Sequence, residues 1–89
     1  MSNSNEFIIA ANTVKKLSQI PNNDELQNLY GFYKQATVGD INIQKPNFLN
    51  FKEVKKWEAW NSCKGLSLFD AEVKYIIFVN NLIQRYGIS

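Results

Sequence analysis

Residues 23–40 read NDELQNLYGFYKQATVGD and carry the clearest structural signal in the chain. A helix is expected to begin at Asn22 or Asn23, because the acidic residues that follow would lie in its first turn, where carboxylates favour the positive end of the helix dipole. Gly39 is suited to the C-terminal cap. Between these ends, apolar and aromatic residues recur at helical spacing and share one face. That face consists of Leu26, Leu29, Tyr30, Tyr33 and Thr37.

Three further helices are expected around this one. No remaining segment shows a convincing strand alternation, since the alternating residues 41–44 are too few. The first should end before Pro21, because the residue that precedes a proline avoids the helical region. Asn50 with Glu53, and Ser67 with Asp70, give box-like starts to the third and fourth helices. The four helices, caps included, cover roughly residues 6–17, 22–39, 50–65 and 67–87.

Each flanking helix has an apolar face that we expect to be buried. Trp57 is the better core candidate of the two tryptophans. The faces are Phe7, Ala11, Val14 and Leu17 in the first helix, Phe51, Val54, Trp57 and Trp60 in the third, and Tyr75, Ile76, Val79, Leu82 and Tyr86 in the fourth. The connection 40–50 is long for a simple up-and-down bundle. It is long enough to cross over, so that the second and third helices run parallel.

Composition bounds the class of protein. A chain of 89 residues, 45% of them apolar, is expected to fold as one domain, residues 1–89. The net charge of +2 is too small to favour nucleic-acid binding. One cysteine and no histidine argue against a zinc site and exclude a Ser-His-Asp or Cys-His pair. Neither a signal peptide nor a transmembrane stretch is visible, so we expect a cytoplasmic protein.

Two clusters on the expected helices could bind a ligand. Tyr30, Tyr33 and Lys34 are neighbours on a helix surface, and such a patch suits an aromatic phosphate compound that stacks on a ring and pairs with an ammonium. A half-buried tyrosine pair beside a solvated lysine is the alternative interpretation. Lys52 and Lys56, four residues apart, repel each other unless an anion lies between them. They could equally form a plain solvated face.

No catalytic group is assembled by the sequence. Cys63 has no histidine partner, and we expect it to be unreactive. The carboxylates form no clear pair, and the four glycines match neither a P-loop nor a dinucleotide-binding loop. These observations predict a binding protein that is not an enzyme.

The run from Tyr30 to Asp40, followed by Trp57-Glu-Ala-Trp60-Asn and Lys64-Gly65, resembles the acyl-CoA-binding protein family. The resemblance covers nearly the whole chain, from Phe7 to Gly87. It implies an all-α four-helix bundle, up-down-down-up, with a long overhand connection between helices 2 and 3. It also implies that fatty acyl-CoA binds in an open bowl on the bundle. We further expect a monomer with no cofactor and no metal.

The resemblance also implies which residues bind the ligand. The adenine would stack on Tyr33, and the 3′-phosphate would be held by Tyr30, Lys34 and Lys56. Tyr75 would contact the ligand as well. Positions matching Lys15 and Lys52 line the family's site, and Leu26 is our own candidate for a wall beside the acyl tail.

The expected function is therefore that of an intracellular carrier of medium- to long-chain acyl-CoA esters. The alternative is a helical protein-interaction module, and nucleic acid is not an expected partner. The chain departs from the family pattern at Asn22, at Glu53 and in the apolar character of its fourth helix. Ile77, Phe78 and Ile83 could form an exposed patch on that helix, which leaves open a transient contact with a membrane or an enzyme.

Overall fold

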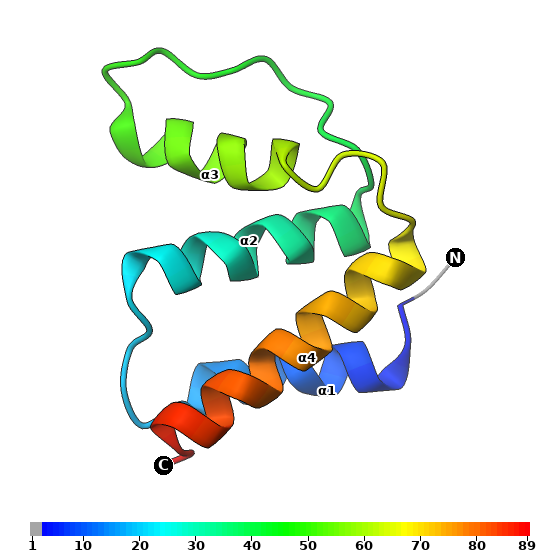
Figure 1. Cartoon of the computed structure of the whole chain (residues 1–89), viewed down its shortest axis with the longest axis vertical. Coiled ribbons are helices and arrows are strands. Elements are labelled where there is room, and N and C mark those ends of the chain that lie inside the picture. The colour runs from blue at the N-terminus through cyan, green and yellow to red at the C-terminus, as the bar shows by residue number, and fades with distance from the viewer. Residues whose placement is uncertain (1–2) are drawn as a thin grey trace.

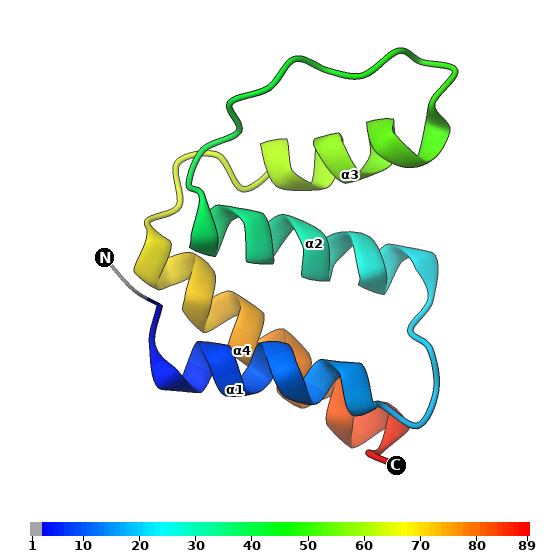
Figure 2. The same cartoon turned by 180° about the vertical axis from the view of Figure 1, so that it is seen from behind.

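The computed structural model describes residues 3–89, which form four α-helices. They are α1 (Asn5–Thr13), α2 (Asn23–Thr37), α3 (Phe51–Asn61) and α4 (Leu68–Tyr86). Figures 1 and 2 show α2 and α3 running in the same direction, with α1 and α4 running the opposite way. The long connection between α2 and α3 returns along the outside of α3. The expected all-α, up-down-down-up bundle with an overhand connection is therefore confirmed.

The first helix is shorter than predicted. α1 ends at Thr13, and one turn of 3-10 helix follows at Val14–Lys16. Leu17 then pairs with Ile88 in an isolated antiparallel bridge, in which the Ser18 N–H donates to the Gly87 carbonyl at 2.8 Å. The chain around Leu17, which was expected to end the first helix, therefore pairs with the C-terminal residues instead.

Side-chain caps explain three of the four helix starts. Ser4 and Ser67 accept hydrogen bonds from the backbone of Phe7 and Asp70, and Asn22 forms a full capping box with Glu25. The predicted cap at Asn50 is wrong, because its side chain accepts no such bond. Its backbone has ψ near 69°, away from the extended geometry that a capping residue needs.

The core lies between α1, α2 and α4. Its fully buried members are Phe7, Ala10, Leu29, Ala36, Ala71, Tyr75, Val79 and Leu82. The remaining predicted core residues of the first and fourth helices, Ala11, Val14, Leu17, Ile76 and Tyr86, are half-buried against this cluster. The apolar faces expected for these two helices therefore do pack into the core.

Among the described elements, α3 packs against α2 alone. The core prediction for Phe51 is wrong, because its side chain is 68% exposed. Trp60 is the buried tryptophan and Trp57 is only half-buried, which reverses the sequence prediction. A helix with a single neighbour has a narrow buried stripe, and that stripe falls on Trp60. The indole N–H groups of Trp57 and Trp60 donate to the carbonyls of Ile43 and Gly39, so both rings hold the long connection.

Gly31 sets the distance between α2 and α3. A Cβ at this position would lie 2.6 Å from the carbonyl oxygen of Ala59. Two helices approach this closely only where one of them has no side chain. α3, with its lysines, is thereby held beside the middle of α2.

The exposed apolar patch that Ile77, Phe78 and Ile83 could have formed on the fourth helix is not present. Ile77 is 55% exposed, but Phe78 is half-buried and meets Phe32 edge to face, with ring centres 6.0 Å apart. Ile83 is half-buried against the core. The contact patch is therefore reduced to a single isoleucine of the three, because α4 packs against both α1 and α2.

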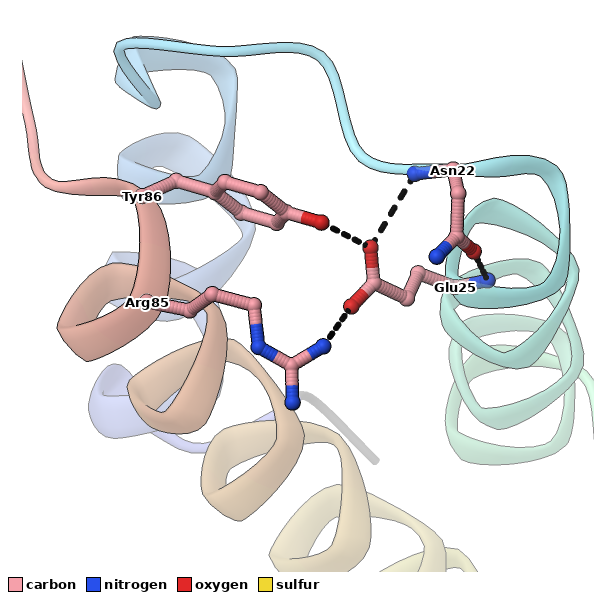
Figure 3. Close-up of polar contacts among 4 residues, drawn as sticks. All are labelled: Asn22, Glu25, Arg85 and Tyr86. Atoms are coloured by element: carbon pink, nitrogen blue, oxygen red, sulfur yellow. Dashed lines mark hydrogen bonds and ion pairs between the residues drawn. The ribbon is translucent and has the colours of Figure 1, made fainter.

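A buried carboxylate joins the start of α2 to the end of α4. Glu25 accepts hydrogen bonds from the Tyr86 hydroxyl at 2.6 Å, from Arg85 at 2.5 Å and from the Asn22 backbone at 3.0 Å (Figure 3). The hydrogen bond from Tyr86 has the largest effect in holding the pKa of Glu25 below its ordinary value of 4.5. This cluster fixes the end of the bundle at which α2 begins and α4 ends.

Candidate site between the helices

A cavity of about 470 Å³ opens between α1, α2 and α4. Five of the eight predicted site residues line it: Lys15, Leu26, Tyr30, Tyr33 and Tyr75. Lys15 belongs to the 3-10 turn after α1, three residues come from one face of α2, and Tyr75 comes from α4. The packing of the three core helices therefore brings together residues that are far apart in the sequence.

A second cavity, of about 440 Å³, lies between α2 and α3. Lys52 and Lys56 line it together with Leu26 and Tyr30. Leu26 and Tyr30 thus belong to both cavities, and α2 separates an aromatic hollow on one side from a lysine-rich hollow on the other. Seven of the eight predicted residues line one or both hollows.

Three aromatic rings in mutual contact form the floor of the first cavity, with Phe7 and Tyr33 stacked and Tyr75 tilted against both. The ring centre of Phe7 is 5.6 Å from Tyr33 and 4.9 Å from Tyr75, and the two tyrosine rings are 5.8 Å apart. Tyr75 is 4% exposed, whereas Tyr33 is 40% exposed. Burial, with the neighbouring Tyr33, raises the pKa of Tyr75 to about 12. Tyr75 therefore stays a neutral phenol, and Tyr33 presents a fixed ring to solvent.

The lysines differ in their surroundings. The Lys56 ammonium lies 5.0 Å from the centre of the Tyr30 ring and 3.6 Å from the Glu53 carboxylate. The Lys34 ammonium lies 4.9 Å from the centre of the Trp60 ring, and Lys34 lines neither cavity. Lys34 is thus the one predicted site residue that the fold does not bring to the hollows, although it is on the same helix as Tyr30 and Tyr33.

Other lining residues were missed by sequence reasoning. Ile8 and Asn12 line the first cavity beside Lys15, and Phe51 and Lys55 line the second. The first group could have been found, since residues 8, 12 and 15 follow one another at helical spacing. Helical periodicity predicts that Phe51 lies in the core, whereas its exposure depends on how α3 packs, which periodicity does not reveal.

Residues 3–89 contain no group of three or more His, Cys, Asp or Glu side chains placed to hold a metal ion. No helix in this part of the chain has the length and apolar character needed to cross a membrane. The residues that line the two hollows provide rings, hydroxyls, ammonium groups and apolar surface, which together suit an amphiphilic aromatic anion.

Fold and site define a small helical binding protein with an open, two-sided hollow. The chain belongs to the acyl-CoA binding protein family, since the family model described as "Acyl CoA binding protein" matches residues 4–79. It is 53% identical over 77 residues to Acyl-CoA-binding protein 2 of Saccharomyces pastorianus, covering 86% of this chain and 88% of that protein.

Two crystal structures have the same fold. Oryza sativa Acyl-CoA-Binding Protein 2 superposes with a TM-score of 0.86 at 38% sequence identity, covering 90% of this chain and 87% of the rice chain. ACBP from Moniliophthora perniciosa superposes with a TM-score of 0.86 at 33% identity, covering 94% of this chain and 83% of that chain. The family resemblance predicted from the tyrosine-lysine run and the tryptophan pair is thereby confirmed. The family is one of binding proteins, in agreement with the prediction that this chain is not an enzyme.

Proposed function

We propose that the protein is a cytoplasmic single-domain carrier of fatty acyl-CoA esters of medium to long chain, which it binds without transforming. The observation that carries this proposal is the junction of two unlike hollows at Leu26 and Tyr30. One hollow has stacked aromatic rings and the other has lysines beside apolar surface. An acyl-CoA ester has an aromatic base, phosphates and an apolar tail, and so needs all of these surfaces at once. Membership of the acyl-CoA binding protein family supports the carrier over a protein-interaction module.

In this proposal the base stacks on Tyr33, the most exposed ring of the aromatic floor. Tyr30, Lys34 and Lys56 hold the 3′-phosphate, while Lys15, Lys52 and Tyr75 line the remainder of the bound ester. For Lys34 this requires its ammonium to leave the face of Trp60. Each charge-assisted hydrogen bond to phosphate contributes about 1.5–3 kcal/mol. The affinity for the 3′-phosphate is thus expected to be shared among Tyr30, Lys34 and Lys56.

The acyl tail supplies the selectivity for the ester over free CoA. Leu26, 42% exposed at the junction of the hollows, is the proposed wall beside the tail. Transfer of apolar groups out of water contributes about 0.8 kcal/mol per methylene. Ten buried methylenes would contribute about 8 kcal/mol before the cost of ordering the chain. Affinity is therefore expected to rise steeply with chain length.

Parallel calorimetric titrations with palmitoyl-CoA, free CoA and palmitate test the proposal. We expect one ester to bind per protein, with affinity at least about a hundredfold above that of either fragment, because each fragment lacks one set of contacts. Recovery of intact ester after long incubation checks that no chemistry occurs. Equal binding of palmitate and the ester would contradict the phosphate contacts, and absence of ester binding would contradict the function itself.

A further inference from the structure

Three large apolar side chains protrude where the long connection enters α3. Phe48 is 81% exposed, Leu49 is 78% exposed and Phe51 is 68% exposed. They follow one another within four residues, whereas single exposed apolar residues are common on any protein surface. A contiguous exposed apolar group of this kind is typical of an interaction site.

The local fold does not require these side chains. Residues 47–50 form a tight turn, in which the Asn47 carbonyl accepts the Asn50 N–H at 2.8 Å. The Asn47 side chain also accepts the Leu49 N–H at 2.8 Å. Phe48 and Leu49 occupy the two central positions, where Gly, Pro, Asn and Asp are usual. Asn47 therefore builds the turn, and the two apolar residues remain unexplained by it.

Positive charge surrounds the same turn. Residues 45–56 contain four lysines and one glutamate. Lys45 pairs with Glu58 at 3.3 Å and Lys56 pairs with Glu53 at 3.6 Å. Within residues 3–89, Lys52 and Lys55 form no ion pair. The Lys55 ammonium instead lies 5.4 Å from the centre of the Phe51 ring, so the protruding apolar group is bordered by uncompensated cations.

We propose that this tip, formed by Phe48, Leu49, Phe51, Lys52 and Lys55, docks the protein on an anionic lipid bilayer. Apolar side chains on a projecting turn fit a fluid apolar phase, which needs no preformed pocket. The bordering lysines match the anionic headgroups at the bilayer surface. This combination of shape and charge favours a bilayer over a protein partner, whose surface would need a matching groove.

The tip lies next to the second cavity, since Phe51, Lys52 and Lys55 also line that hollow. Docking would therefore turn the mouth of the hollow toward the bilayer. In a carrier of acyl-CoA, as proposed above, this orientation places the site where amphiphilic esters partition. The docking itself does not depend on that function.

Vesicle sedimentation tests the proposal with the full chain. We expect the protein to bind vesicles of phosphatidylcholine mixed with phosphatidylserine, and to bind vesicles of phosphatidylcholine alone far more weakly. Added salt should weaken the binding, because it screens the lysines from the headgroups. The double variant Phe48→Ser, Leu49→Ser should lower the partition coefficient by about tenfold or more. Neither residue lines either hollow, so palmitoyl-CoA affinity and helical circular dichroism should stay at wild-type values.

Phe69→Ser is the matched control. Phe69 is 71% exposed, and it lies at the start of α4, which Figure 1 places at the opposite end of the bundle from the start of α3. Phe69 is followed by the acidic residues Asp70 and Glu72, whereas the residues of the tip are followed by lysines. We expect wild-type vesicle binding from this variant. Equal loss in both variants would contradict a localised docking tip.

Two further outcomes would overturn the proposal. One is that the wild-type protein fails to sediment with anionic vesicles. The other is binding to polyglutamate but not to vesicles, which would indicate an acidic protein partner. Loss of palmitoyl-CoA binding in every sample, with vesicle binding intact, would refute the carrier function and leave the docking inference standing.

Discussion

At the scale of single residues, Tyr33 combines fixed geometry with exposure. Its ring stacks on Phe7 and packs at a tilt against Tyr75, yet 40% of its surface remains accessible. A side chain held by its neighbours loses little freedom when a ligand arrives, so stacking on it costs little ordering entropy. Tyr75, in contrast, is almost fully buried, and its ring packs against both Phe7 and Tyr33.

Replacing Tyr33 with alanine should therefore reduce affinity more than stability. Stacking of a base on an aromatic ring contributes about 1–3 kcal/mol, so Tyr33→Ala should weaken palmitoyl-CoA binding by about tenfold to a hundredfold. Calorimetric titration measures the change. Tyr33→Phe retains the ring and should keep most of the affinity. Unchanged binding by the alanine variant would remove Tyr33 from the site.

At the scale of helices, the contact between α2 and α3 depends on the absence of one methyl group. Gly31 faces the carbonyl of Ala59, with only 2.6 Å between that oxygen and the position of a Cβ. A glycine inside a helix normally reduces stability by up to about 1 kcal/mol relative to alanine. Here the close approach of the helices outweighs that cost.

Gly31→Ala should consequently destabilise the fold, although alanine has a higher helix propensity than glycine. A Cβ against backbone atoms forces the helices apart, and such overpacking costs about 1–3 kcal/mol. Urea unfolding followed by circular dichroism measures the free energy of unfolding. Asn28→Ala, at an exposed position of the same helix, is the control and should be neutral or slightly stabilising. A stabilised Gly31→Ala protein would show that α3 can shift without penalty.

At the scale of the whole molecule, two carboxylates tie together segments that are distant in the chain. Glu25 links α2 to Arg85 and Tyr86 at the end of α4. Glu72 of α4 accepts hydrogen bonds from the Asn3 side chain at 2.6 Å and the Ser4 backbone at 3.1 Å. Burial by itself would raise the pKa of Glu72, but the hydrogen bonds from Asn3 and Ser4 outweigh it and lower the pKa.

Stability should therefore decline at both ends of the pH scale. The pKa values of Glu25 and Glu72 lie below their ordinary 4.5 in the folded protein, so their stabilisation is present above pH 4.5 and is lost as the pH falls through the lowered values. The pKa of Tyr75 is raised from 10.0 to about 12, so its neutral form stabilises the fold below pH 10 and this contribution is lost between pH 10 and about 12. Thermal unfolding midpoints measured across pH would show both declines.

Two variants separate these contributions. Glu72→Gln should flatten part of the acid decline, since the amide does not titrate. Tyr75→Phe should flatten part of the alkaline decline, and the remainder belongs in part to Tyr86, whose pKa is raised first by its hydrogen bond to Glu25. An alkaline decline of unchanged size in Tyr75→Phe would contradict the role given to the buried phenol.

Local signals in the sequence were enough to predict the four helices, both caps of the fourth helix and the family. Helical periodicity and capping residues act within a few positions, so Ser67 and Gly87 could be assigned directly, and the start of α2 could be narrowed to Asn22 or Asn23. The tyrosine-lysine run on α2 is equally local. It supplied Tyr30 and Tyr33, which the fold then placed in the first cavity.

Tertiary packing was needed to establish which members of each apolar stripe are buried and where the lysines point. α3 has one helical neighbour, so Trp60 is buried, Phe51 is exposed and the Lys34 ammonium lies over an indole ring. From the sequence, Glu25 was expected only to be an acidic residue in the first turn of a helix, because Arg85 and Tyr86 are about sixty residues away along the chain. Burial and ion pairing depend on which surfaces meet, and that is fixed by the packing of whole helices and not by the spacing of residues within one of them.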